Sequence, residues 1–123
     1  MWNAEEKYIF DFERLRVYEM GLEFIRKIFS FTKKLTRDYQ FSLGDQLRRA
    51  ALSIVNNIAE GSGKLSKKEK SQFYRFSLNS ARECIPMLTI LSKDKIISEL
   101  EHNNLRKECI YICNMLGKLI VAA

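Results

Sequence analysis

The sequence has few residues that interrupt helices: one proline and five glycines among 123 residues. It also has a single histidine, His102, and no serine or cysteine is placed to complete a catalytic triad with it. Three cysteines cannot all pair within one chain, which indicates a reducing compartment. No apolar run approaches the roughly 20 residues that cross a membrane, and no secretory signal opens the sequence. We therefore expect a cytoplasmic protein without membrane contact.

Residue sets that hold metals or phosphates are also scarce. Cys109 and Cys113 lie four residues apart, but a structural zinc site needs about four ligands and the others are missing, so core thiols are the better interpretation. The Gly-Ser-Gly at 61–63 lacks the strand and spacing of a phosphate-binding loop. Glu60 and Glu83 could form an acid–base pair, although a structural ion-pair network is favoured because arginines are available as counter-ions. We expect no enzyme activity, metal or cofactor.

Helical periodicity is what the sequence does have. Apolar residues recur at spacings of three and four from about residue 11 to 37, then over 43–63, from Ser66 to Leu91 and from Ser98 onward. Capping boxes, a serine followed three residues later by glutamate, open the last two segments. Ser42 with Asp45 resembles a cap for the second segment, Gly61 suits a left-handed helix end, and Pro86 predicts a kink.

Short connections between these segments favour antiparallel neighbours. A hydrophobic content of 46% with 29% charged residues is typical of a globular domain with one core. The sequence thus predicts a single all-α domain over residues 1–123, an antiparallel up-down-up-down four-helix bundle preceded by a tail at residues 1–10.

The first helix is apolar on two sides. One row, within residues 15–32, has the spacing of a bundle seam, and a second row repeats every seven residues. In a lone bundle the second row would be an exposed apolar patch, so it predicts a subunit interface. The N-terminal tail folding over this row is the alternative. The predicted oligomer seam consists of Val17, Met20, Phe24 and Phe31.

The second and third helices each carry a row of small polar residues instead of the lysines and glutamates of a solvated face. Short amides and hydroxyls suit a close helix contact in which polar groups are satisfied internally. We interpret the two rows as one structural network between helices, with Ser77 beside it. Its members are Gln46, Arg49, Ser53, Asn57, Glu60, Ser80 and Glu83.

The net charge of +6 is unevenly distributed: residues 14–37 carry +5 and residues 62–83 carry +4. In an antiparallel bundle these segments lie at opposite ends, and a ring of subunits would repeat each cluster around a rim. Such clusters suit contacts with a nucleic-acid backbone, with little base readout. The candidate nucleic-acid-binding residues are Arg26, Lys27, Lys33, Lys34, Arg37, Lys64, Lys67, Lys68, Lys70 and Arg75.

Several of these motifs resemble one family. QLRRAALSIVNNIAEGSG at 46–63, the Ser-x-x-Glu at 66–69, Phe73 and Ser-Ala-Arg-Glu at 80–83 are similar to the four-helix-bundle family of 23S rRNA intervening-sequence proteins. FDFERLRVYEMGLEFI at 10–25 resembles the first helix of that family, so the similarity covers about residues 10–120. Asn-Ile-Ala-Glu-Gly at 57–61 is its most specific part.

The resemblance implies more than a fold. The family includes the accessory variability protein of diversity-generating retroelements. In the assembly that this resemblance implies, five four-helix protomers form a barrel, and the barrel binds nucleic acid and a reverse transcriptase. By resemblance, this chain would be a homopentamer without catalytic residues, with RNA or DNA and a reverse transcriptase as further partners. The resulting hypothesis is a non-enzymatic, oligomeric nucleic-acid-binding accessory protein. The alternative is a structural or protein-interaction oligomer whose charge keeps it soluble.

Overall fold

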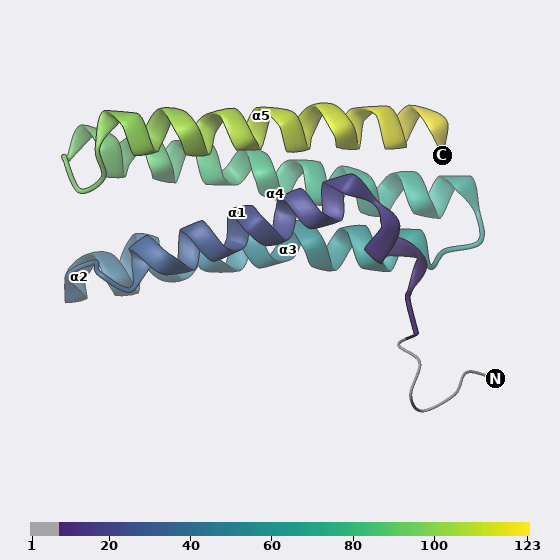
Figure 1. Cartoon of the computed structure of the whole chain (residues 1–123), viewed down its shortest axis with the longest axis horizontal. Helices are drawn as coiled ribbons and strands as arrows, with labels where there is room; N and C mark the ends of the chain where they lie inside the picture. Colours follow the sequence, from purple (N-terminus) through teal and green to yellow (C-terminus); the bar gives the residue numbers. More distant parts are fainter. Residues whose placement is uncertain (1–7) are drawn as a thin grey trace.

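Four long helices make up the part of the chain that the computed structural model describes, residues 8–123; most of the expected N-terminal tail lies outside it. The helices are α1 (Arg16–Thr32), α3 (Asp45–Ser62), α4 (Lys67–Lys93) and α5 (Glu99–Ala122). They run antiparallel to their neighbours (Figure 1), and residues 8–123 contain no strand. The predicted all-α four-helix bundle is confirmed.

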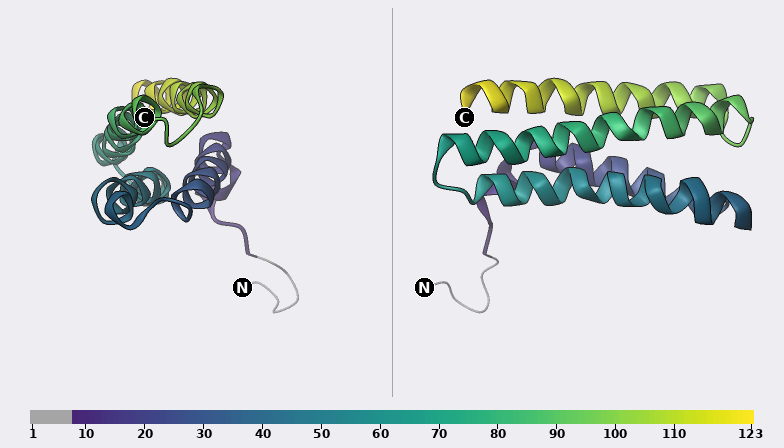
Figure 2. Two further views of the ribbon diagram at one scale, coloured as in Figure 1. Left: turned by 90° about the vertical axis from the view of Figure 1, so that its left-hand side faces the viewer. Right: turned by 180° about the vertical axis from the view of Figure 1, so that it is seen from behind.

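Packing is uneven around the bundle. Viewed end-on, α1 lies beside α3, α3 beside α4 and α4 beside α5 (Figure 2). The contact between α3 and α4 is the most extensive, and that between α1 and α5 is the least extensive of these neighbouring pairs. The bundle is therefore most open between its first and last long helices. No helix of residues 8–123 contains a stretch long and apolar enough to cross a membrane.

Serine N-caps begin the last two helices as predicted; the reciprocal capping box is complete at Ser98 and Glu101, whereas at Ser66 the Glu69 carboxylate accepts from the serine hydroxyl instead of the serine amide. The Ser66 hydroxyl accepts a hydrogen bond from the Glu69 amide at 3.1 Å, and Ser98 accepts one from the Glu101 amide at 3.0 Å. At the start of the chain, Asp11–Arg14 forms a single 3-10 turn, η1, and α1 begins only at Arg16.

The second helical segment begins earlier than Ser42. The chain turns helical at α2 (Arg37–Tyr39) and continues through a π-helical turn, η2 (Gln40–Gly44), into α3. The Gln40 side-chain amide donates to the carbonyl of Thr32 at 2.6 Å, which satisfies the end of α1. The Asp45 amide, which Ser42 was expected to cap, already donates to the carbonyl of Gln40 because the helical run is continuous from Arg37, and the Ser42 hydroxyl instead donates to the carbonyl of Asp38 at 2.8 Å.

Gly61 does not adopt the left-handed conformation that the sequence predicts. No described glycine has a positive φ, and α3 continues through Gly61 to Ser62. A Cβ at Gly61 would lie 3.0 Å from the Cβ of Phe73 and from the ring of Tyr74. The glycine is required by the close approach of α4. Helix α4 itself continues past Pro86 to Lys93.

The predicted oligomer seam on α1 is wrong in its main members. Val17 is 3% exposed and Phe24 is fully buried, and both belong to the core of the single chain. Met20 and Phe31 are half-buried against that core. Conversely Leu22, from the row assigned to the bundle interior, is 39% exposed. Both rows are apolar, so their periodicity could not show which one faces α3.

Substitution of Phe24 by alanine should lower the free energy of unfolding by about 3–5 kcal/mol, because it leaves a cavity in the core. The matched control is Leu22→Ala on the same helix, whose half-exposed side chain should cost less than about 1 kcal/mol. Urea denaturation followed by circular dichroism at two protein concentrations measures both. A Phe24→Ala loss that disappears at the higher concentration would place this ring in a subunit interface instead.

Candidate nucleic-acid interface

The ten candidate basic residues form two groups at opposite ends of the bundle (Figure 1). One group lies on the C-terminal half of α1 and the turn into α2, and the other lies on the connection from α3 and the first turns of α4. All are exposed except Lys64 and Lys70, which are half-buried. We call them the α1-end group (Arg26, Lys27, Lys33, Lys34, Arg37) and the α4-start group (Lys64, Lys67, Lys68, Lys70, Arg75).

Two cations of the α4-start group have local structural contacts. The Lys70 ammonium donates to the carbonyl of Ser62 at 2.8 Å and so satisfies the end of α3. Lys64 lies 3.6 Å from a carboxylate oxygen of Glu60 and 5.1 Å from the centre of the Phe73 ring. These contacts hold the connection between α3 and α4. The exposed cations that remain on this end are Lys67, Lys68 and Arg75.

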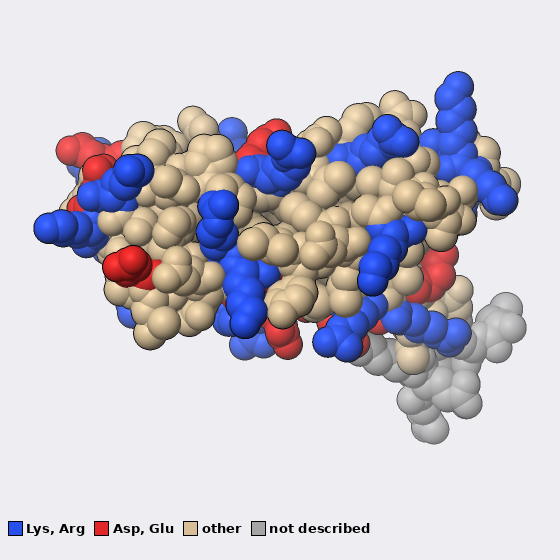
Figure 3. Space-filling model, turned by 90° about the horizontal axis from the view of Figure 1, so that it is seen from above, with Lys and Arg blue, Asp and Glu red and all other residues tan. Residues whose placement is uncertain are grey.

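Basic side chains are also spread along the molecule. On the face seen from above, lysine and arginine side chains occur over its whole length, with fewer acidic ones between them (Figure 3). They do not merge into one continuous patch on this face. A distributed set of cations suits contacts with successive phosphates along a strand better than it suits a single small anion.

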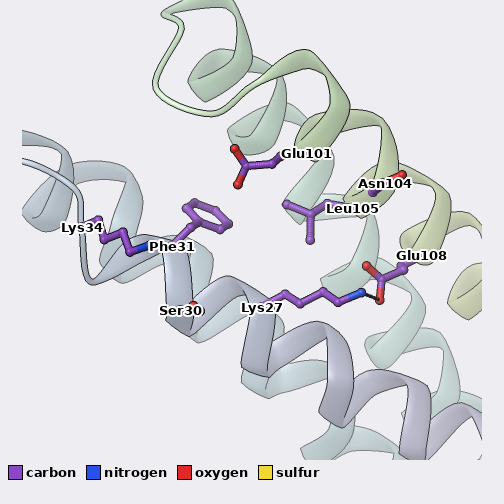
Figure 4. A pocket seen from close by; sticks show the side chains of 8 residues that line it. All are labelled: Lys27, Ser30, Phe31, Lys34, Glu101, Asn104, Leu105 and Glu108. Atoms are coloured by element: carbon purple, nitrogen blue, oxygen red, sulfur yellow. Dashed lines mark ion pairs between the residues drawn. The ribbon is translucent and has the colours of Figure 1, made fainter.

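A pocket of about 270 Å³ opens between α1 and α5, where the bundle is least closed (Figure 4). Each side of the pocket is lined by four residues at spacings of three, one and three, which on a helix is one face. The Phe31 ring and Leu105 supply its apolar surface. The lining residues are Lys27, Ser30, Phe31 and Lys34 of α1 and the turn after it, with Glu101, Asn104, Leu105 and Glu108 of α5.

Glu108 is the most constrained polar group of this pocket. Its side chain is 20% exposed, and one carboxylate oxygen, Oε1, lies 3.1 Å from the ammonium of Lys27. The other oxygen, Oε2, is buried and has no hydrogen-bond partner among the described residues. Leaving a buried acceptor unsatisfied costs about 1–3 kcal/mol or more when it is charged. The neighbouring Glu101 is oriented by its capping role, since its Oε1 accepts from the Ser98 amide at 3.2 Å.

Sequence reasoning missed this pocket. It assigned Phe31 to a subunit seam and used Glu101 only as a cap, and it gave Asn104 and Glu108 no role. The regular spacing of residues 101, 104, 105 and 108 was the available signal, because it puts three polar side chains around one leucine.

Part of the predicted polar network forms between α3 and α4. The Asn57 amide donates to the hydroxyl of Ser53 at 2.9 Å, and the Ser80 hydroxyl reaches across from α4 to the same oxygen at 2.8 Å. The fully buried hydroxyl of Ser77 donates to the carbonyl of Ile54 at 2.7 Å. A serine side chain is so short that these contacts need helix axes at the near end of the usual separation of about 8–10 Å.

The network is shorter than the sequence predicts. The side chains of Gln46, Arg49 and Glu83 are exposed and make no hydrogen bond or ion pair within the described chain, while the Glu60 side chain pairs only with Lys64. A row at seven-residue spacing drifts by about 20° per heptad around a straight helix, so its ends leave the contact. These side chains lie on the outer face of α3 and α4.

The three thiols lie in or beside the core. Burial raises the pKa of Cys84 to about 12, and it raises the pKa of Cys109 further. The pKa of the half-buried Cys113 is also raised, chiefly by desolvation. No group of three or more histidine, cysteine or acidic side chains within residues 8–123 is placed to hold a metal ion.

Fold and site together define a class of protein: an antiparallel four-helix bundle in which serine hydroxyls hold the two central helices together and cations lie at both ends. The chain belongs to the family of 23S rRNA-intervening sequence proteins, whose model matches residues 13–118. It is similar to a crystal structure from Bacteroides thetaiotaomicron, described as a protein of unknown function from the S23 ribosomal protein family. The TM-score is 0.78 at 24% identity, covering 85% of this chain and 94% of that one, which supports the fold alone. No curated protein matches the sequence.

Thiol chemistry should follow this burial. In the folded protein at pH 8 we expect Cys113 to react first with a disulfide reagent, and Cys84 and Cys109 only on unfolding. Because the folded-state pKa values are raised, the free energy of unfolding should be maintained below pH 9, the ordinary thiol pKa here, and fall as the pH rises toward 12. Urea midpoints at pH 8 and 10.5 measure this fall. A Cys84→Ala variant with an equally steep fall would contradict the assignment.

Proposed function

We propose that this chain is a non-enzymatic, homo-oligomeric protein that binds nucleic acid through its surface lysines and arginines and acts as an accessory factor. The observation that carries the proposal is the placement of exposed cations, carried by helices of a packed bundle, at both of its ends. A net charge of +6 supports attraction to a polyanion. The family description, which refers to 23S rRNA, favours RNA as that polyanion.

The chemistry of the interface supports binding to the backbone more than reading of sequence. Lysine and arginine contacts with phosphates release counter-ions, so such binding weakens steeply as salt is added. The α1-end and α4-start groups lie too far apart to act on one phosphate, but they can engage separate segments of one structured RNA. In an oligomer each group would be repeated, which multiplies weak contacts.

We place the subunit contact on the outer face of α3 and α4, because the α1 row expected to form it is buried. Phe76 of α4 is 44% exposed and Leu52 of α3 is 40% exposed. Exposed polar groups of the same face, among them Gln46 and Glu83, are available to hydrogen-bond with a second copy. A pentamer is the assembly that the family resemblance implies, with a reverse transcriptase as a further partner. The same apolar residues also support the second candidate function, a structural or interaction oligomer without nucleic acid.

Charge reversal at Lys67 and Lys68 tests the nucleic-acid proposal. The double change to glutamate should weaken binding to a fluorescent structured RNA at least tenfold in 50 mM salt and reduce the dependence of log Kd on log salt by about 1–2. Fluorescence anisotropy over a salt series measures both quantities. The matched control is Arg106→Glu with Lys107→Glu, which makes the same change in net charge on exposed positions of α5. Equal losses of affinity in the two double variants would mean that Lys67 and Lys68 act only through the net charge, which would contradict an interface at this end.

Substitution of Phe76 by aspartate tests the assembly. We expect the mass measured by light scattering to fall to that of a single chain, because a buried interface charge without a partner is costly. Ile110→Asp is the control, since Ile110 is similarly exposed, at 49%, but lies on α5. An unchanged mass for Phe76→Asp, or the same fall for Ile110→Asp, would contradict the placement on α3 and α4.

A further inference from the structure

The pocket between α1 and α5 combines three features that a simple basic surface does not need. It has an aromatic wall, Phe31; a carboxylate with a buried acceptor, Glu108; and lysines from the α1-end group, Lys27 and Lys34 (Figure 4). Its volume of about 270 Å³ lies just below the roughly 300–1,000 Å³ of pockets that take drug-sized ligands. It therefore suits one planar ring system.

The charges of the pocket restrict the chemistry of its ligand. The carboxylates of Glu101 and Glu108 oppose an anion placed inside, and the ammonium groups of Lys27 and Lys34 oppose a cation. A neutral ring with several N–H donors can satisfy the carboxylates, and a phosphate joined to that ring can stay at the rim and satisfy the ammonium groups. Single-stranded RNA presents this combination, because an unstacked base can turn into a protein pocket while its phosphates remain outside.

Among the bases, guanine matches the carboxylates. Its pairing edge places the N1–H and N2–H donors side by side, and one carboxylate can accept both. Adenine and cytosine place a ring-nitrogen acceptor beside their single amino group, and uracil has one N–H between two carbonyls. Both of these patterns put a second acceptor against a carboxylate oxygen, which is unfavourable.

We propose that this pocket binds an unpaired guanine of single-stranded RNA. The base stacks on Phe31 and donates to Glu108, and a neighbouring phosphate takes the ammonium of Lys27, which now pairs with Glu108 at 3.1 Å. The Lys27 side chain is 58% exposed, so it can turn outward at low cost. The exchange gives the buried Oε2 of Glu108 the donor it lacks. The proposal rests on the nucleic-acid binding proposed above.

The test compares short uridine oligomers that carry one central guanosine, inosine or adenosine. Fluorescence anisotropy with the unaltered protein should show the guanosine oligomer binding about tenfold tighter than the adenosine one, the scale of a good bidentate base contact. Inosine, which lacks the N2 amino group, should fall between them. Equal affinity for all three oligomers would overturn the proposal and leave the salt-dependent binding, and so the proposed function, intact.

Two variants locate the guanine. Glu108→Gln and Phe31→Leu should each reduce the preference for guanosine, measured as the ratio of the affinities for the guanosine and adenosine oligomers, to about twofold or less. Glu99→Gln is the control, because it removes one charge from the same end of α5 outside the lining of this pocket. A guanosine preference that survives both variants would overturn the assignment.

If the unaltered protein binds none of the oligomers or structured RNA at low salt, both proposals fail together. The inosine comparison leaves the protein unchanged, so a variant that does not fold cannot decide the outcome.

Discussion

The hydrogen bond from the buried hydroxyl of Ser77 to the backbone carbonyl of Ile54 sets the distance between the two central helices. It can form only if α3 and α4 lie close together, and that approach requires small side chains on both. Gly61 is the smallest residue at the point where α4 passes α3, since even a Cβ at this position would lie 3.0 Å from Phe73. Ser53 and Ser80 supply small side chains about two turns away from Gly61. The α3–α4 pair is therefore the most extensive helix contact of the bundle, and α1 packs on α3 while α5 packs on α4.

The openness between α1 and α5 follows from this arrangement. α1 packs closely on α3, where a Cβ at Gly21 would lie 2.7 Å from Val55, and α5 packs on α4. α1 and α5 have no equally close contact with each other, so polar side chains lie in the space between these two helices. The Lys27–Glu108 ion pair crosses it and joins an exposed ammonium to a carboxylate that is only 20% exposed. Such a carboxylate needs a new donor whenever the ammonium moves away.

The sequence predicted the features that depend on neighbours along the chain. The serine N-caps of α4 and α5 are local, and the four helical segments follow from periodicity. The wrong expectations all depend on distant contacts. Phe24 lies in the core because α3 packs on that side of α1, and the Gly61 conformation is decided by α4. The spacing of residues 101, 104, 105 and 108 indicates one wall of the pocket, but the other wall comes from α1, which is far from α5 in sequence, so no local pattern could reveal the whole pocket.

The family pattern and the proposed function depend on different parts of the molecule. The stretch at 46–63 is recognisable because close packing of α3 on α4 limits its inner positions to small and apolar residues, such as Ala51 and Ser53. Lysines at the bundle ends meet no such steric condition, since their side chains extend into solvent. A change of charge there would alter the proposed binding at little cost to the fold, because surface substitutions usually change stability by less than about 0.5 kcal/mol. Membership of the family thus follows from the interior of the bundle, whereas affinity for RNA would be set by its ends and by the pocket between α1 and α5.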